Sequence, residues 1–309
     1  MNGLAFDLPF PPVRNHHVAA VRAPVWQWVK KFGLPGGRPA VHRMGLDLLA
    51  AHIYPSASPE NLALLTKWLI WSFLLDDQFD DKAVDDVTLA PHYLLTEMHA
   101  IINGEQREWD NPLTAALADL WRATNEKRSP EWQASLKVHM AAYLTSYLRE
   151  MSDRVSGRHL SLPTYLGHRR DSVAMAAFLN LSEISTGIEL DPDVRDSPTL
   201  TAAHRALSDH VGAVNDIFSH RKETAFGYYH NAVCIVSAEQ GLPVRRSMEV
   251  VRDLADDFMH EYQSLEPTLT VPDIYRNEMR ALVRGHVTWC RLTARYNIPT
   301  PIQRAKAHR

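Results

Sequence analysis

The chain has 309 residues, of which 45% are hydrophobic, and its 33 Lys and Arg against 36 Asp and Glu give a formal net charge of −3. This near balance creates no overall field for recruiting nucleic acid or an anionic membrane. The longest apolar run, Trp68–Leu75, is too short to span a bilayer, and Met1 to Pro12 lacks the basic and apolar segments of a signal peptide. We therefore expect a cytoplasmic protein that binds neither nucleic acid nor membrane.

Prolines mark where most predicted helices begin. A Ser or Asn followed by Pro is typical of a helix N-cap and first turn, where the N–H that proline lacks costs no hydrogen bond. Stretches with apolar residues three and four apart follow, in chain order, Pro59, Pro112, Pro130, Pro163, Pro198, Pro243 and Pro272. The sequence contains no alternating β-branched run and no hairpin signal between them.

These patterns predict an all-α fold with roughly ten helices and short connections. Residues 1–309 contain no repeat and no low-complexity linker, so we expect one domain, a helical bundle whose site lies in the bundle core. Segments 1–20 and 297–309, the second of which is basic, are expected to be flexible or to cap the bundle.

Aspartates follow the most apolar predicted helix. The run Trp68–Leu75 is apolar nearly all round, which predicts burial, and it continues into Asp76, Asp77, Asp80 and Asp81. On a helix Asp76 and Asp80 share a face with Asp77 close by, so their charges repel unless water or a cation intervenes. Mg²⁺ prefers oxygen ligands and is held by one or two carboxylates plus substrate phosphates, which suits this acidic edge. A solvated helix end is the alternative for the motif alone.

A second set of potential metal ligands occurs on a later predicted helix. Asn215, Ser219 and Glu223 are spaced four apart, so their oxygens form a stripe that rises about 12 Å and turns about 80° around the helix. Amide, hydroxyl and carboxylate oxygens suit Mg²⁺ and leave coordination sites for phosphate, to which Lys222 could add a direct contact. Alone, the stripe is more typical of a polar helix face with Ser219 bonded to its own helix. Two such motifs on separate helices favour magnesium.

With both motifs the sequence resembles the bacterial class I terpene synthases, whose signature is an aspartate-rich motif on one helix and an N-D-x-x-S-x-x-x-E triad on another. The resemblance covers nearly the whole chain, including Phe6-Asp-Leu-Pro-Phe10, Trp28 ahead of Phe32-Gly-Leu34, Tyr54-Pro55 and Arg295-Tyr296. It implies an enzyme that uses Mg²⁺, with three ions expected, to ionise an isoprenoid diphosphate and turn the carbocation into a hydrocarbon or alcohol. Similar enzymes often form antiparallel dimers, so a homodimer is a further expectation.

The resemblance also implies which motif residues bind metal. Asp76 should ligate magnesium, with Asp80 as a second candidate, while Asp77 should pair with an arginine when the site closes. The remaining ion should be held by the ligands of the second motif, Asn215, Ser219 and Glu223.

The departing diphosphate needs fixed cations. Arg169-Arg170 stands where the family keeps its diphosphate-binding arginine, and we choose Arg170, forty-five residues before Asn215. A guanidinium binds phosphate through two parallel N–H bonds, and Arg295 with Tyr296 should close over the same group.

The family also has a helix break shortly after this arginine, often with a glycine whose carbonyl points at the ionising carbon. Ala174 occupies that position here, preceded by Val173. The resemblance assigns Val173 and Ala174 to this linking and effector segment.

A carbocation needs an apolar, closed cavity with aromatic faces. Phe73 is one turn before Asp76 and is therefore expected to face the cavity, and the resemblance places Trp289, six residues before Arg295, on the opposite side. Aromatic residues at helical spacing are otherwise core residues.

Three alternatives remain open. Farnesyl diphosphate is chosen as the commonest substrate among similar proteins, which makes the product a sesquiterpene; geranylgeranyl diphosphate, giving a diterpene, is the first alternative. A chain-elongating prenyl diphosphate synthase would need two aspartate-rich motifs, and Asp256-Asp257 lacks the third Asp. The third alternative is a non-catalytic helical protein that binds diphosphate, and Ala174 is the one feature that supports it.

Overall fold

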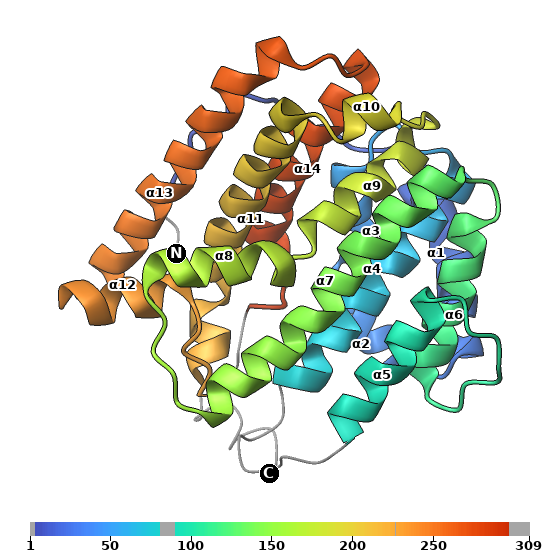
Figure 1. Ribbon diagram of the computed structural model, residues 1–309, viewed down its shortest axis with the longest axis horizontal. Coiled ribbons are helices and arrows are strands. Elements are labelled where there is room, and N and C mark those ends of the chain that lie inside the picture. The colour runs from blue at the N-terminus through green and yellow to red at the C-terminus, as the bar shows by residue number, and fades with distance from the viewer. Residues whose placement is uncertain (1–3, 81–89, 226, 297–309) are drawn as a thin grey trace.

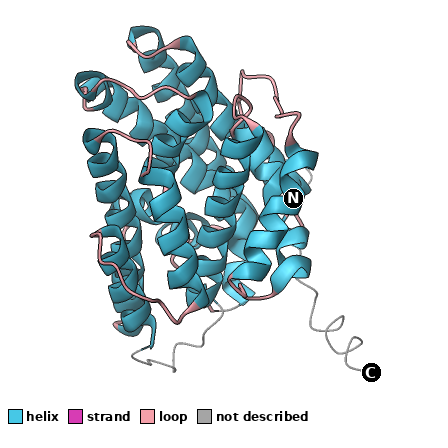
Figure 2. Ribbon diagram, turned by 90° about the vertical axis from the view of Figure 1, so that its right-hand side faces the viewer, coloured by secondary structure: helices cyan, strands magenta, loops and turns pink. Residues whose placement is uncertain are grey.

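A computed structural model describes residues 4–80, 90–225 and 227–296. Within them the chain forms fourteen α-helices, one 3₁₀ turn and no strand (Figures 1 and 2), which confirms the all-α prediction. The helices are α1 Val18–Lys31, α2 Gly37–Met44, α3 Leu46–Ile53, α4 Pro59–Asp80, α5 Ala90–Ile102, α6 Pro112–Asn125, α7 Pro130–Val155, α8 Leu162–Ser172, α9 Met175–Thr186, α10 Pro192–Arg195, α11 Pro198–Ala225, α12 Ala232–Gln240, α13 Val244–Leu265 and α14 Asp273–Leu292, with the 3₁₀ turn at Glu266–Thr268.

The helices begin where the prolines predict. The side chains of Asn111, Ser129 and Ser161 each accept a backbone N–H of the following first turn, with a proline at the first or second helical position. The described helices outnumber the roughly ten predicted ones partly because Gly45 and Ala174, both with left-handed backbone, divide continuous apolar stretches in two.

Long helices pack side by side around one continuous cluster of buried apolar side chains. Helix α11 packs against α13, α14 against α3, and α1 against α4. Gly285 allows the close approach of α14 to α3, because a Cβ there would lie 2.7 Å from the carbonyl carbon of His52. In Figure 1, α8 crosses in front of α11, so that residues far apart in sequence meet at one end of the bundle.

Helix α4 is buried over the apolar run, as its sequence predicts. Trp68 and Trp71 are both fully buried, and their indole N–H groups donate to Thr124 Oγ1 at 2.8 Å and to the Leu113 carbonyl at 2.9 Å. Both polar atoms of these large side chains are therefore satisfied, and the helix that carries Asp76 is rigidly placed.

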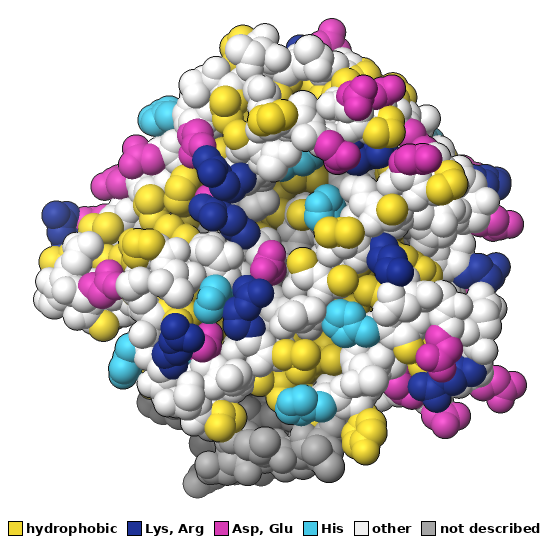
Figure 3. Space-filling model, in the orientation of Figure 1, with side chains coloured by type: hydrophobic (Ala, Val, Ile, Leu, Met, Phe, Trp, Pro, Cys, Tyr) yellow, Lys and Arg dark blue, Asp and Glu magenta, His cyan; other side chains and the backbone are white. Residues whose placement is uncertain are grey.

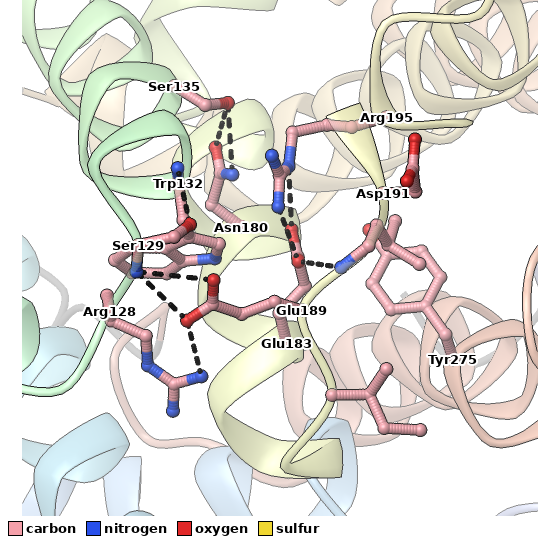
Figure 4. Close-up of polar contacts among 12 residues, drawn as sticks. Arg128, Ser129, Trp132, Ser135, Asn180, Glu183, Glu189, Asp191, Arg195 and Tyr275 are labelled. Atoms are coloured by element: carbon pink, nitrogen blue, oxygen red, sulfur yellow. Dashed lines mark hydrogen bonds and ion pairs between the residues drawn. The ribbon is translucent and has the colours of Figure 1, made fainter. Parts of the chain in front are cut away.

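A polar network fixes the turn between α9 and α10 (Figure 4). Glu183 of α9 is buried, pairs with Arg195 of α10 at 2.9 Å and accepts the backbone N–H of Leu190 at 2.6 Å. Beside it Asn180 bonds to Ser135 of α7 at 3.2 Å. The network links α7, α9 and α10 through groups that would be costly to leave unpaired.

The N-terminal segment covers the bundle. Phe6 is buried against the rings of His210 and Phe218, and the backbone N–H of Asp7 donates to Asp256 on α13. The segment 297–309, for which we predict flexibility or capping, lies outside the described residues.

The described surface carries charges of both signs. On the face shown in Figure 3, Lys and Arg side chains alternate with Asp and Glu without a broad area of one sign. None of the helices in the described part of the chain is long and apolar enough to cross a membrane.

Candidate active site

A cavity lies among α3, α4, α8, α9, α11 and α14. The two predicted metal motifs, on α4 and α11, lie in its polar part. The polar residues that line this part are Asp76, Arg169, Asn215, Ser219, Glu223 and Arg295. Its apolar part is lined by Leu49, Ile53, Leu69, Phe73, Val211 and Leu282. The structure therefore brings both predicted metal motifs to one end of an apolar pocket.

At the acidic wall, Asp76 and Asp77 are bound by cations from elsewhere in the chain. Arg295, whose side chain is only 6% exposed, contacts Asp76 at 2.8 Å and Asp77 at 2.9 Å. Lys222 of α11 donates to Asp77 at 3.2 Å. Arg295 therefore pairs with both aspartates, Asp77 among them. Asp80 ends α4, and its side chain lies outside the described residues.

These contacts set the charge state of the wall. Burial alone would raise the pKa of Asp77, but the charges of Arg295 and Lys222 lower that pKa below its ordinary value. Burial disfavours the charged form of Arg295 as well, yet Asp77 and Asp76 raise its pKa. Both partners are therefore ionised, and Arg295 supplies a fixed positive charge at the mouth of the cavity.

Across the cavity, Asn215, Ser219 and Glu223 line the wall from α11. Asn215 Nδ2 donates to the Tyr296 hydroxyl at 2.9 Å, and Glu223 accepts from the buried amide of Asn231 at 2.8 Å. The buried Ser219 Oγ has no hydrogen-bond partner among the described residues. An unpaired buried hydroxyl is costly, which indicates that a ligand completes it.

Arg169 reaches the same wall from α8. Its Nε donates to Asp216 Oδ1 at 3.0 Å and its Nη2 to Asn215 Oδ1 at 2.9 Å. The buried Asp216 carboxylate also accepts from the Tyr165 hydroxyl at 2.6 Å, so it holds the guanidinium in place. Gly212 makes room for this arrangement, because a Cβ there would lie 3.1 Å from Arg169 Cγ.

The choice of Arg170 as the arginine facing the cavity is wrong. Arg170 pairs with Asp209 through two hydrogen bonds of 2.8 and 2.9 Å and lines a different hollow, bounded by α7, α9 and α11. Consecutive residues on a helix point about 100° apart, so an offset of one residue moves the side chain to another face. Arg169, forty-six residues before Asn215, faces the cavity instead.

The predicted helix break lies beside Arg169. Helix α8 ends at Ser172, and Ala174 has a φ of 59° before α9 begins, the one positive φ of a non-glycine residue among those described. Val173 and Ala174 both line the cavity. The break between α8 and α9 therefore forms part of the cavity wall.

The two predicted aromatic residues lie at different depths. Phe73 lines the cavity, and the Arg295 guanidinium sits 4.8 Å from its ring centre. Trp289 is not among the described residues that line the cavity, which corrects the prediction. It packs behind Phe73, with ring centres 5.2 Å apart, because its indole N–H donates to the Met44 carbonyl at 2.7 Å and draws the ring into the core.

Comparisons with known proteins agree with this geometry. Residues 67–261 match the family model described as terpene synthase family 2, C-terminal metal binding. The chain is 31% identical to (2Z,6E)-hedycaryol synthase of Kitasatospora setae over 82% of this chain and 76% of that protein. It is 30% identical to pentalenene synthase of Streptomyces avermitilis, covering 94% and 92%. The chain belongs to terpene synthase family 2.

The fold of this terpene synthase also matches solved structures. Its TM-score is 0.81 against the linalool/nerolidol synthase from Streptomyces clavuligerus in complex with 2-fluorogeranyl diphosphate, with 25% identity over 93% of this chain and 98% of that one. The helical fold is thus shared with that synthase.

The metal-binding character of the family fits the residues present in this terpene synthase. Within the described residues no three His, Cys, Asp or Glu side chains form one cluster, so candidate ligands divide between the acidic wall and α11. On α11 the unpaired Ser219 Oγ lies one turn from both Asn215 and Glu223. This set of hard oxygen donors, one lacking a partner, suits a divalent cation bound jointly with phosphate.

Sequence reasoning missed the residues that orient this wall. Asp216 lies inside the second motif, and its burial between α8 and α12 is visible only in three dimensions. Asn231 bonds both the Asp216 carbonyl and Glu223 from the start of α12. The one sequence signal was Asn231 followed by an apolar run, which is typical of an N-cap.

Proposed function

We propose that this terpene synthase converts farnesyl diphosphate to a sesquiterpene with release of diphosphate, using three Mg²⁺ ions. The observation that carries the proposal is the meeting of both motif helices and Arg169 at the polar end of one apolar cavity. The diphosphate occupies that end and the isoprenoid chain fills the apolar part. Sesquiterpene products named among the relatives, such as pentalenene, support the chain length.

The proposed metal ligands are Asp76, with Asp80, on the acidic wall and Asn215, Ser219 and Glu223 on α11. Bound Mg²⁺ supplies Lewis-acid stabilisation of the charge that develops on the leaving diphosphate. The chain adds fixed donors of its own. Asp216 orients the Arg169 guanidinium, whose Nη2 turns from Asn215 to phosphate oxygens when Asn215 binds metal. Arg295, Tyr296 and Lys222 lie around the same position.

Ionisation then needs protection from water. Arg295 and Tyr296 lie three and four residues after the end of α14, and both side chains are largely enclosed, so they cover the polar end of the cavity. The Phe73 face, beside Arg295 and one turn before Asp76, offers its π electrons to the cation. The backbone at Val173 and Ala174 lies where the ionising carbon would be held.

The test is incubation of the purified enzyme with geranyl, farnesyl and geranylgeranyl diphosphates, each with Mg²⁺ and with EDTA, followed by diphosphate assay and gas chromatography–mass spectrometry. We expect a magnesium-dependent sesquiterpene from farnesyl diphosphate. A diterpene from the longest substrate would correct the chain length. Longer diphosphates formed with added isopentenyl diphosphate would overturn the proposal, as would ligand-induced thermal stabilisation without any turnover.

A further inference from the structure

A histidine side chain lies in the cavity wall beside apolar residues. His286 of α14 lines the cavity one turn after Leu282, which lines it as well. Its Nε2 lies 3.4 Å from Cys290 Sγ, whereas its buried Nδ1 has no hydrogen-bond partner among the described residues. An unsatisfied buried nitrogen costs stability, so its place in the wall of a reaction cavity needs a reason.

Other histidines show that the combination is particular to this position. His168 and His210 also have a buried ring nitrogen without a hydrogen bond, although His168 Nδ1 lies 3.5 Å from the Asp153 carboxylate. Neither histidine is among the described residues that line the cavity. His210 donates through Nδ1 to the Ala255 carbonyl at 2.8 Å and is enclosed in the core. Of these three side chains, only His286 combines an unpaired nitrogen with a position in the cavity wall.

The surroundings keep the His286 ring neutral. Burial first, then the nearby His210 ring and the Arg169 guanidinium, lower the pKa of His286 to about 3. In the tautomer with hydrogen on Nε2, the ring donates to Cys290 Sγ and Nδ1 holds a lone pair. Two hydroxyl groups in the cavity wall are already hydrogen-bonded: the Ser72 hydroxyl donates to the Leu69 carbonyl, and Tyr143 bonds to Tyr147. Neither hydroxyl oxygen is as basic as an imidazole nitrogen.

We propose that His286 is the base that ends the reaction by accepting a proton from the final carbocation. This inference rests on the proposed function. The C–H bond next to the cationic carbon breaks, its electron pair becomes the π bond of a new double bond, and the proton bonds to Nδ1. The neutral ring thereby becomes an imidazolium, which returns its proton to the diphosphate product or to water when the cavity reopens. A hydrogen next to a cationic carbon is far more acidic than any imidazolium, so the transfer is downhill.

The test compares H286F, which keeps a ring, and H286N, which keeps a polar group, with wild type on farnesyl diphosphate. Two quantities are measured: the rate of diphosphate release, which reports ionisation, and the ratio of hydrocarbon to alcohol products. We expect diphosphate release within about threefold of wild type, because ionisation does not use this base. The hydrocarbon-to-alcohol ratio should fall by about tenfold or more in both variants as water takes over termination.

L282M is the matched control, since it changes the shape of the same wall one turn away without removing a base. It should alter the proportions among hydrocarbons while keeping the hydrocarbon-to-alcohol ratio. Thermal melting by circular dichroism establishes that each variant is folded. An unchanged ratio in both His286 variants, with diphosphate still released, would overturn the proposal. A wild-type alcohol that becomes a hydrocarbon in the variants would overturn it too, by showing that the ring delivers water. Failure of wild type to release diphosphate would instead refute the proposed function.

Discussion

At the scale of single residues, the neighbouring Arg169 and Arg170 have different surroundings. Arg169 and Arg170 each bind a buried carboxylate of α11, Asp216 and Asp209, so together they clamp α8 to that helix. Only Arg169 also reaches the cavity, where it bonds Asn215. The pairing fixes the rotation of α8 and hence which of its two guanidinium groups faces the cavity.

Conservative substitution separates the two arginines. R169K keeps the charge but loses the planar fork of donors, so kcat/KM for the diphosphate substrate should fall by about 100-fold. R170K changes a pair that faces away from the cavity, and we expect kcat/KM within about threefold of wild type. Steady-state kinetics by diphosphate release measures both. Equal losses in the two variants would place the diphosphate elsewhere.

The unpaired hydroxyl of Ser219 predicts a metal phenotype without a stability cost. S219A removes a proposed metal ligand, and the Mg²⁺ concentration for half-maximal activity should rise by about tenfold or more. Folding stability should stay level or rise, since a buried group without a partner is lost. S208A is the control on the same helix, because the Ser208 hydroxyl donates to the His204 carbonyl away from the motif. Both variants are compared by magnesium titration of activity and by urea unfolding. If the Mg²⁺ dependence of S219A is the same as that of wild type, Ser219 is not a metal ligand.

At the scale of elements, the break between α8 and α9 places a residue with a strained backbone in the cavity wall. Ala174 adopts a left-handed backbone that L-residues avoid, at a cost of about 1–2 kcal/mol. Its N–H still bonds to the Asp171 carbonyl at 3.1 Å, and its own carbonyl accepts from Phe178 at 3.1 Å. Bonds on both sides hold the strained residue in place at the cavity wall.

Glycine at this position should relieve the strain. We expect A174G to stabilise the protein by up to about 1 kcal/mol, because the gain at positive φ exceeds the entropy that glycine adds to the unfolded chain. A238G, at an exposed position inside α12, should instead cost about 1 kcal/mol. Urea denaturation compares them, and destabilisation of similar size in both variants would argue against a left-handed Ala174.

At the scale of the whole molecule, a buried glutamate couples stability to pH. Glu278 of α14 accepts from the Ser56 N–H at 3.0 Å and from the Ser185 hydroxyl at 2.5 Å. These bonds tie α14 to α9 and to the loop between α3 and α4. Burial raises the pKa of Glu278 to about 7. The folded protein therefore holds a proton that the unfolded chain has released at neutral pH.

The sign of the effect follows from this difference in proton binding. Because Glu278 binds more protons in the native state than in the unfolded chain, its contribution to the free energy of unfolding is highest below the ordinary glutamate pKa and falls as pH rises to about 7. The loss should be about 3 kcal/mol, from roughly 2.5 pH units at 1.36 kcal/mol each. Urea unfolding of wild type and E278Q at several pH values isolates the contribution: E278Q should lack this part of the slope, and parallel pH profiles would contradict it.

Local sequence determined the positions of the helices and the identity of the two motif sets. Proline with its capping Ser or Asn sets helix starts through groups one turn apart, and an all-apolar run such as Trp68–Leu75 can only be buried. Tertiary packing decided which side chains meet. Whether Arg169 or Arg170 faces the cavity depends on the rotation of α8, and whether Trp289 lines it depends on a bond to Met44 far away in sequence. A step of one residue turns a helix by about 100°, and only contacts between helices fix that angle.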